Sequence, residues 1–211
     1  MTVPRRAWVV AVGAVLLVAL GFVAGSLTFH ANDPGPARDS AGNGPNAVDI
    51  GFAQDMTVHH QQAVYLSQLM QGTGKDPTLA GMAEQIILGQ SKEIGILQGW
   101  LTLWHAPQLP SGPPMAWMHH GSQAMSGMPG MTTSVMPGMA TQEELDRLAE
   151  LHGDDRDRLF AELMIRHHEG GISMADDAAE HAATQEIQNF AATTSYEQRQ
   201  EIGVLRAYLN R

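Results

Sequence analysis

Two short motifs in this chain carry side chains that bind metals. Each has the form Met-x-x-His-His, and they occur at Met56, His59 and His60 and at Met164, His167 and His168. Residues three and four apart lie on one side of a helix, so each motif directs a thioether and imidazoles the same way. Thioether sulfur and imidazole nitrogen are ligands of soft and borderline transition metals. The motifs therefore predict a metal site.

The ligand types indicate which metal is bound. The chain has no cysteine, so a soft-metal site must use Met sulfur or His nitrogen. In di-iron helical bundles the corresponding motif is Glu-x-x-His, with a hard carboxylate in the first position. Met56 and Met164 take that position here. This change favours Cu(I), with Ag(I) or Cu(II) at the imidazoles as alternatives.

The motifs belong to an internal duplication. Residues 49–102 match residues 157–210 at an offset of 108 with thirteen identities and no gap. The matched residues include Gln90 and Glu93 in the first half, which return as Gln198 and Glu201. The chain therefore contains two copies of one structural unit.

Each copy is predicted to be a helical hairpin. In the first copy, apolar residues and His59 recur every three or four positions from Phe52 to Met70, and a second such stripe runs from Leu79 to Leu101. The second copy repeats both stripes, and Thr141 with Glu144 forms a capping-box pattern that starts its first helix, with a bend near Gly153. Four helices in two hairpins predict an all-α, four-helix bundle.

Polar residues interrupt these stripes at matching heights. If the first hairpin turns near residue 74, the helical rise of about 1.5 Å per residue brings Met56 and His59 level with Gln90 and Glu93. The second half then does the same with Gln198 and Glu201. Two interpretations remain open: a hydrogen-bonded polar layer, or a metal layer in which the Gln and Glu residues are ligands or orient the imidazoles.

The segment between the hairpins is rich in Met, Pro and Gly. Its candidate metal ligands are Met115, Met118, His119, His120, Met125, Met128, Met131, Met136 and Met139. All seven methionines belong to Met-x-x-Met pairs, which suit capture of Cu(I) or Ag(I). The alternative is a flexible linker whose methionines pack loosely on the bundle.

The N-terminal region predicts export. Arg5 and Arg6 precede an uncharged segment, residues 7–29, which is about 35 Å long as a helix and can span a bilayer. We expect a single-pass signal-anchor in the cell membrane with the domain on the extracytoplasmic side, or a secreted protein if the segment is cleaved. The expected organisation is residues 1–6 cytoplasmic, 7–29 transmembrane, 30–46 flexible tether, 47–104 first hairpin, 105–140 linker and 141–211 second hairpin.

The doubled Met-x-x-His-His motif, with Gln-x-x-Glu-Ile at 90–94 and 198–202, resembles the domain-of-unknown-function 305 family. The resemblance covers roughly residues 47–210 and includes CopM-like periplasmic copper-binding proteins. It implies a ferritin-like bundle, export, and binding of copper or silver through the six Met and His residues of the two motifs. Gly170 and Gly171 depart from the first repeat, and we expect them to loosen that helix.

These observations favour a non-enzymatic protein that binds copper for sequestration, tolerance or delivery. Its expected partners are the metal ion, the membrane and an exported cuproprotein or copper exporter. A net charge of −10 argues against nucleic acid. The alternatives are a metal-dependent redox enzyme of ferritin-like type, for which no nucleophile or nucleotide loop is visible, and a structural bundle with a hydrogen-bonded His layer.

Overall fold

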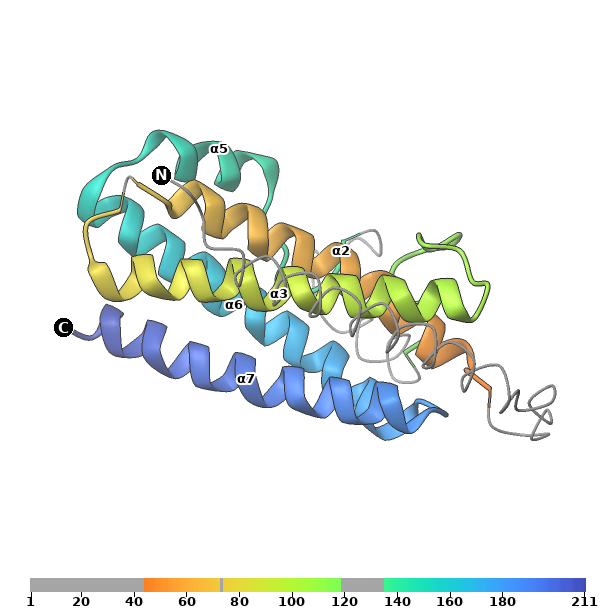
Figure 1. The fold of residues 1–211 in the computed structure, drawn as a ribbon. Coiled ribbons are helices and arrows are strands. Elements are labelled where there is room, and N and C mark those ends of the chain that lie inside the picture. The colour runs from red at the N-terminus through yellow and green to blue at the C-terminus, as the bar shows by residue number, and fades with distance from the viewer. Residues whose placement is uncertain (1–43, 73, 119–134) are drawn as a thin grey trace, which may run out of the picture. The chain divides into compact units, whose positions relative to one another are not determined.

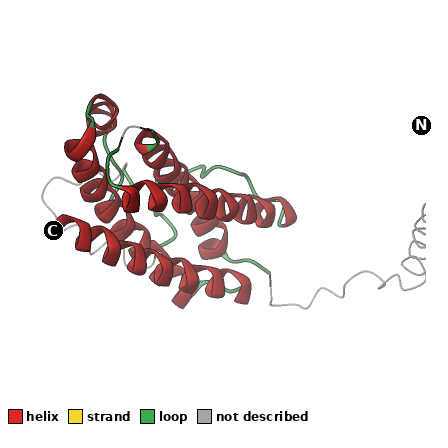
Figure 2. Cartoon of the chain, turned by 60° about the vertical axis from the view of Figure 1, so that its left-hand side comes forward, coloured by secondary structure: helices red, strands yellow, loops and turns green. Residues whose placement is uncertain are grey.

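The described part of the chain is helical. The computed structural model describes residues 44–72, 74–118 and 135–211, and residues 43–211 form one compact unit. Figure 2 shows helices joined by loops, and the described residues contain no strand. The helices are α2 (Ala47–Met70), α3 (Pro77–Leu103), α5 (Gln142–Glu150), α6 (Gly153–His181) and α7 (Gln185–Leu209).

Four long helices form two hairpins, in agreement with the bundle that the duplication predicts. α2 packs against α3, and α6 packs against α7. The hairpins meet mainly through α2 and α6, which run in opposite directions in Figure 1, whereas contact between α3 and α7 is much sparser. The short helix α5 is additional and packs on α2 and α6. The two motif-bearing helices are therefore the central pair.

The predicted membrane-spanning segment, residues 7–29, lies outside the described residues. Of the helices that are described, none is long and apolar enough to cross a bilayer. The tether at residues 30–46 is also described only from Gly44 onward. The anchor and its orientation remain predictions.

Local signals in the sequence set the helix starts. Asp76 caps α3, and Pro77 occupies its first turn. Thr141 and Glu144 form a capping box that starts α5, as the pattern predicts. The predicted bend near Gly153 is a break instead, because α5 ends at Glu150 and α6 begins at Gly153, whose φ is +60°.

Each hairpin supplies a buried aspartate that holds the turn of the other. Asp49 at the start of α2 accepts hydrogen bonds from the backbone N–H groups of Ala183 and Thr184, between α6 and α7. Its counterpart in the repeat, Asp157 on α6, accepts from the backbone N–H groups of Lys75 and Asp76, between α2 and α3. The duplicated aspartates therefore join the two halves reciprocally.

The buried apolar residues form two clusters. One includes Leu66, Leu79, Ile86, Phe160, Met164 and Leu205. The other includes Phe52, Met56, Leu97, Leu101, Met174 and Ile187. None of the four motif histidines belongs to either cluster, although each is fully buried. Buried polar side chains of this kind need partners.

The described ends of the Met-rich linker pack on the bundle. Met115 and Met136 are buried in the cluster that contains Met56, and Trp117 packs edge-on against Phe52. The indole of Trp117 donates to the Asp55 carboxylate at 2.8 Å, and burial raises the pKa of that carboxyl. These linker ends are part of the folded core.

Gly170 and Gly171 do not interrupt their helix. α6 is continuous from Gly153 to His181, so the two glycines do not break it. A Cβ on Gly170 would lie 2.0 Å from the Pro137 carbonyl oxygen, and one on Gly171 would lie 2.5 Å from Gln198 Oε1. The two glycines instead allow a loop and a side chain to approach α6 closely.

Candidate metal centre

The central contact of the bundle joins His59 of α2 and His167 of α6. Both imidazoles are fully buried, and their ring centroids are 3.8 Å apart. Because these residues are 108 apart, they are equivalent positions of the repeat, and their contact places an approximate two-fold axis between them. The centre of the site therefore coincides with the symmetry axis of the duplication.

The hydrogen bonds of this pair break the symmetry. His167 Nε2 lies 3.1 Å from the His59 carbonyl oxygen, whereas His59 Nε2 lies 3.1 Å from the carbonyl oxygen of Pro137. The loop that carries Pro137 is held to α2 by two hydrogen bonds between the Gln62 side chain and the Ala140 backbone. The end of the linker therefore covers His59.

The outer histidines each meet a glutamate from the neighbouring helix. His168 Nε2 lies 2.6 Å from Glu201 Oε2 in a hydrogen bond. His60 Nε2 lies 2.8 Å from Glu93 Oε2, but the carboxylate is off the direction of the ring N–H, so this contact is the weaker one. The predicted pairing of His with Glu across each hairpin is present in both halves.

Three of the four contacts indicate which ring nitrogen carries the proton. Nε2 of His59, His167 and His168 is hydrogen bonded to an oxygen that accepts, which places the hydrogen of each neutral ring on Nε2, whereas Nε2 of His60 lies near Glu93 without a hydrogen bond. In those three rings the lone pair then lies on Nδ1. All four Nδ1 atoms are buried and have no hydrogen-bond partner among the described residues. The layer thus presents four available nitrogen donors.

Burial keeps the central rings neutral. It lowers the pKa of His59 to about 3 and the pKa of His167 well below its ordinary value. The neighbouring histidines lower both pKa values further. A neutral imidazole binds metals without first losing a proton.

The motif methionines lie on either side of the histidine layer. Both thioethers are fully buried, with Met56 in one apolar cluster and Met164 in the other. We predicted that both methionines would share the layer with the histidines. They flank it instead, because the antiparallel helices direct the two equivalent residues toward opposite ends of the bundle.

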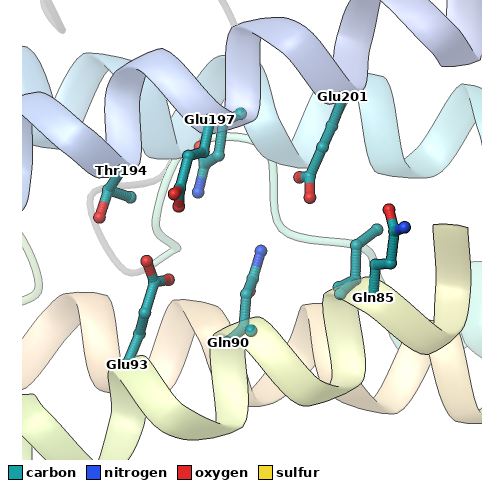
Figure 3. A pocket seen from close by; sticks show the side chains of 9 residues that line it. Gln85, Gln90, Glu93, Thr194, Glu197 and Glu201 are labelled. Atoms are coloured by element: carbon teal, nitrogen blue, oxygen red, sulfur yellow. The ribbon is translucent and has the colours of Figure 1, made fainter.

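The predicted amides and carboxylates meet in a small cavity between α3 and α7. Gln90 and Glu93 line it from α3, and Gln198 and Glu201 line it from α7. The side-chain oxygen of Gln90 and both polar atoms of Gln198 are buried without a hydrogen-bond partner among the described residues. Figure 3 shows Gln90 and Glu93 directed from α3 toward α7.

Three further polar residues of this cavity, Gln85, Thr194 and Glu197, were not predicted. Glu197 and Thr194 line it from α7, opposite α3. Their equivalents in the first half are Gly89 and Ile86, so neither is part of the repeated motif. Glu197 and Thr194 could have been found by comparing the two halves for polar residues near the Gln and Glu positions that have no polar counterpart in the other half.

The linker candidates divide into two groups. Met115, Met118, Met136 and Met139 pack in or against the core cluster that contains Met56. The alternative interpretation is that the linker methionines pack loosely on the bundle; these four do pack on it, but Met115 and Met136 are buried. The candidates His119, His120, Met125, Met128 and Met131 lie outside the described residues.

The donor set suits soft metals rather than hard ones. Within the described ranges, no group of three or more His, Asp or Glu side chains is arranged to hold a metal ion. This includes the four layer histidines, but their imidazole nitrogens and the buried thioethers of Met56 and Met164 occur in and beside one layer. Such donors fit Cu(I) and Ag(I) better than Mg²⁺, Ca²⁺ or Mn²⁺.

Comparison with known families gives a direct match. The family model described as "Domain of unknown function (DUF305)" matches residues 49–209. That range covers both Met-x-x-His-His motifs and the segment between them. A search of curated proteins found no match.

Several solved structures share the fold. A putative secreted DUF305 protein from Streptomyces coelicolor is 34% identical, with a TM-score of 0.69, over 77% of this chain and 92% of that one. A DUF305 fragment from Deinococcus radiodurans is 27% identical, with a TM-score of 0.64, over 79% and 98%. CopM in its Cu(II)-bound form is 25% identical, with a TM-score of 0.59, over 76% and 94%.

Proposed function

Since this chain belongs to the DUF305 family, we propose that it binds copper, or silver, in the histidine layer between its two hairpins. The structures of CopM include Cu(I)-bound, Cu(II)-bound and Ag-bound forms. They share the fold of this chain, which supports metal binding at the level of the family. The proposed role is to hold the ion for sequestration, tolerance or delivery, without turnover.

One observation carries the proposal. Four buried Nδ1 atoms are without a hydrogen-bond partner among the described residues, while Nε2 is hydrogen bonded to an oxygen in three of the four rings and lies near Glu93 in His60. A purely hydrogen-bonded layer would use both nitrogens of each ring, because an unpaired buried polar atom costs about 1–3 kcal/mol. Metal-binding imidazoles show the observed pattern, with one nitrogen free and the other donating to an oxygen.

The residues take distinct roles in this proposal. The imidazoles of His59, His60, His167 and His168 supply the nitrogen donors. Met56 and Met164 supply thioethers from either side of the layer, and Glu93 and Glu201 orient the outer imidazoles. Cu(I) is the expected ion, since its preferred ligands are thioether and imidazole.

The test is anaerobic titration of the protein with Cu(I) against a competing chelator. Three proteins are compared: the wild type, a layer variant with Met56, His60, Met164 and His168 replaced by Ala, and a linker variant. The linker variant replaces Met125, Met128 and Met131 by Leu and His119 and His120 by Gln. It leaves the packed linker ends intact, which a deletion of the linker would not.

We expect the layer variant to lose the tightest site and the linker variant to keep it. Circular dichroism must show that both variants retain the helical fold. A folded layer variant with wild-type stoichiometry and affinity would make the layer structural and end the proposal. If binding were lost only in the linker variant, the metal site would be in the linker rather than in the histidine layer.

We also propose that the protein works outside the cytoplasm, anchored by residues 7–29. The hydrophobic length of that segment supports an anchor, and the similar Streptomyces protein is described as secreted. Copper exporters and exported cuproproteins would then be its partners. Sequencing the N-terminus of the native protein tests this: an intact start in the membrane fraction supports the anchor, and a start after residue 24 indicates cleavage.

A further inference from the structure

The cavity between α3 and α7 has a polar lining that the histidine layer alone does not require. It is partly open to solvent and has a volume of about 40 Å³, room for a small cation with little of its hydration shell. Its polar lining comes from Gln85, Gln90, Glu93, Thr194, Glu197, Gln198 and Glu201. Figure 3 shows Glu197 and Thr194 directed from α7 toward α3. The cavity forms where the two hairpins make little contact.

Three carboxylates give this cavity a negative charge. Glu197 is an exposed side chain at the edge of the cavity; its partial desolvation raises its pKa, and the charges of Glu93 and Glu201 raise it further, with an opposing effect from Lys92. Carboxylates that disfavour one another's charge are stabilised when a cation comes between them. The cavity therefore attracts cations.

Buried polar atoms face the same space. Gln90, Gln198 and Thr194 are all at least 95% buried, and side-chain atoms of each are without a hydrogen-bond partner among the described residues. Leaving such atoms unpaired costs stability. A cation or a water molecule that enters the cavity and binds to these atoms would offset that cost.

The lining departs from the symmetry of the repeat at two positions. Glu197 stands where the first half has Gly89, and Thr194 stands where it has Ile86. A Cβ on Gly89 would meet no atom within 4 Å, so the glycine leaves space opposite the added carboxylate. The second half thus adds a charge and a hydroxyl that a purely structural duplication does not need.

A single side chain in each half of the bundle connects the cavity to the histidine layer. Glu93 and Glu201 line the cavity and also contact His60 and His168. On another side of the layer, the loop at Pro137 covers His59. A cation that enters between α3 and α7 therefore meets carboxylates first and then the Nε2 side of the outer imidazoles, beyond which lie their Nδ1 atoms.

We propose that this cavity is the port through which the metal cation reaches the histidine layer, with Glu197 and Thr194 as its transit ligands. The inference rests on the proposed function, since it assumes that the layer takes up copper or silver. Glu197 attracts the incoming ion, and the buried amide and hydroxyl oxygens replace water that the ion loses. Glu93 and Glu201 then lead it to the outer imidazoles.

Three variants test the port, each made in the linker variant so that only the layer takes up metal. E197Q removes the charge, T194V removes the hydroxyl at constant shape, and G89L fills the cavity. E180Q, an exposed glutamate on α6, and G95L, an exposed glycine on α3 whose Cβ would also meet no atom within 4 Å, are the matched controls. Uptake of Ag(I) is followed by rapid mixing, chelator quench and metal counting by mass spectrometry.

We expect each port variant to slow uptake roughly three- to ten-fold at low salt, in the lower range of electrostatic steering effects. Dissociation constants should change less than the rates. The E197Q effect should shrink in 1 M salt, whereas the effects of T194V and G89L should persist. T194V and G89L should not lower the melting temperature, because they remove an unpaired hydroxyl and a helical glycine.

Uptake by all three port variants at the control rates would overturn the port while leaving the proposed function standing. Wild-type uptake no greater than that of the layer variant would overturn both. A slow rate accompanied by an equal loss of equilibrium affinity would make these residues part of the final binding site, which also contradicts transit.

Discussion

At the scale of single residues, the most informative atoms are the ring nitrogens of four histidines. The sequence predicts that imidazoles and carboxylates share a layer, because equal distances from the hairpin turn place them level. It does not predict which nitrogen is free, since that depends on acceptors such as the Pro137 carbonyl oxygen, 78 residues from His59 in the chain. Glu197 was missed because Gly89 replaces it in the other half.

The glutamates that contact the outer histidines give a prediction at this scale. E201Q keeps the size of the side chain but weakens the acceptor for the His168 N–H, so it should lower copper affinity about ten-fold, at the lower end of such effects. E93Q should have a smaller effect, because Glu93 is poorly aligned with the His60 N–H. Chelator competition measures both, with E180Q as the control. Equal affinity in all four proteins would show that these carboxylates do not support the metal.

At the scale of secondary-structure elements, the periodicity of apolar residues predicted the four long helices. Three of them begin after residues whose side chains cap the helix, Asn46, Asp76 and Thr184, whereas α6 has no side-chain cap. The linker ends were harder to predict, because no local pattern determines how Met115 and Met136 reach the core. Tertiary contacts determine it, including an approach at Gly51, where a Cβ would lie 2.3 Å from the Trp117 ring.

The reciprocal aspartates give a prediction for the hairpin turns. D49N and D157N each place an amide N–H₂ near backbone donors, so each should lower the free energy of unfolding by roughly 1–3 kcal/mol. Asp154 is the matched control, since its side chain is 73% exposed and pairs only with Lys75 among the salt bridges of the described residues. D154N should change stability by less than about 1 kcal/mol. Thermal or urea unfolding of the three variants measures the difference, and a loss in D154N as large as in D157N would refute this role.

At the scale of the whole molecule, the layer joins two hairpins that otherwise meet through α2 and α6. A metal bound there takes ligands from both halves, so it should stabilise the entire cooperative unit rather than one hairpin. At a free metal concentration 100 times the dissociation constant, the gain is about 2.7 kcal/mol. We expect a single unfolding transition that moves to higher temperature with Ag(I), as measured by calorimetry. A split transition, or no shift in the wild type, would contradict a site shared between the hairpins.

The linker is longer than its path requires. From Glu93, level with the layer, to the end of α3 at Leu103 is about 15 Å of helix. About five extended residues would return the chain from there to Pro137, where it meets His59. The chain has 33 residues between Leu103 and Pro137. The return to the layer therefore needs only a small part of that length, and the described ends of the linker are held instead by packing of Met115, Trp117 and Met136 on the core.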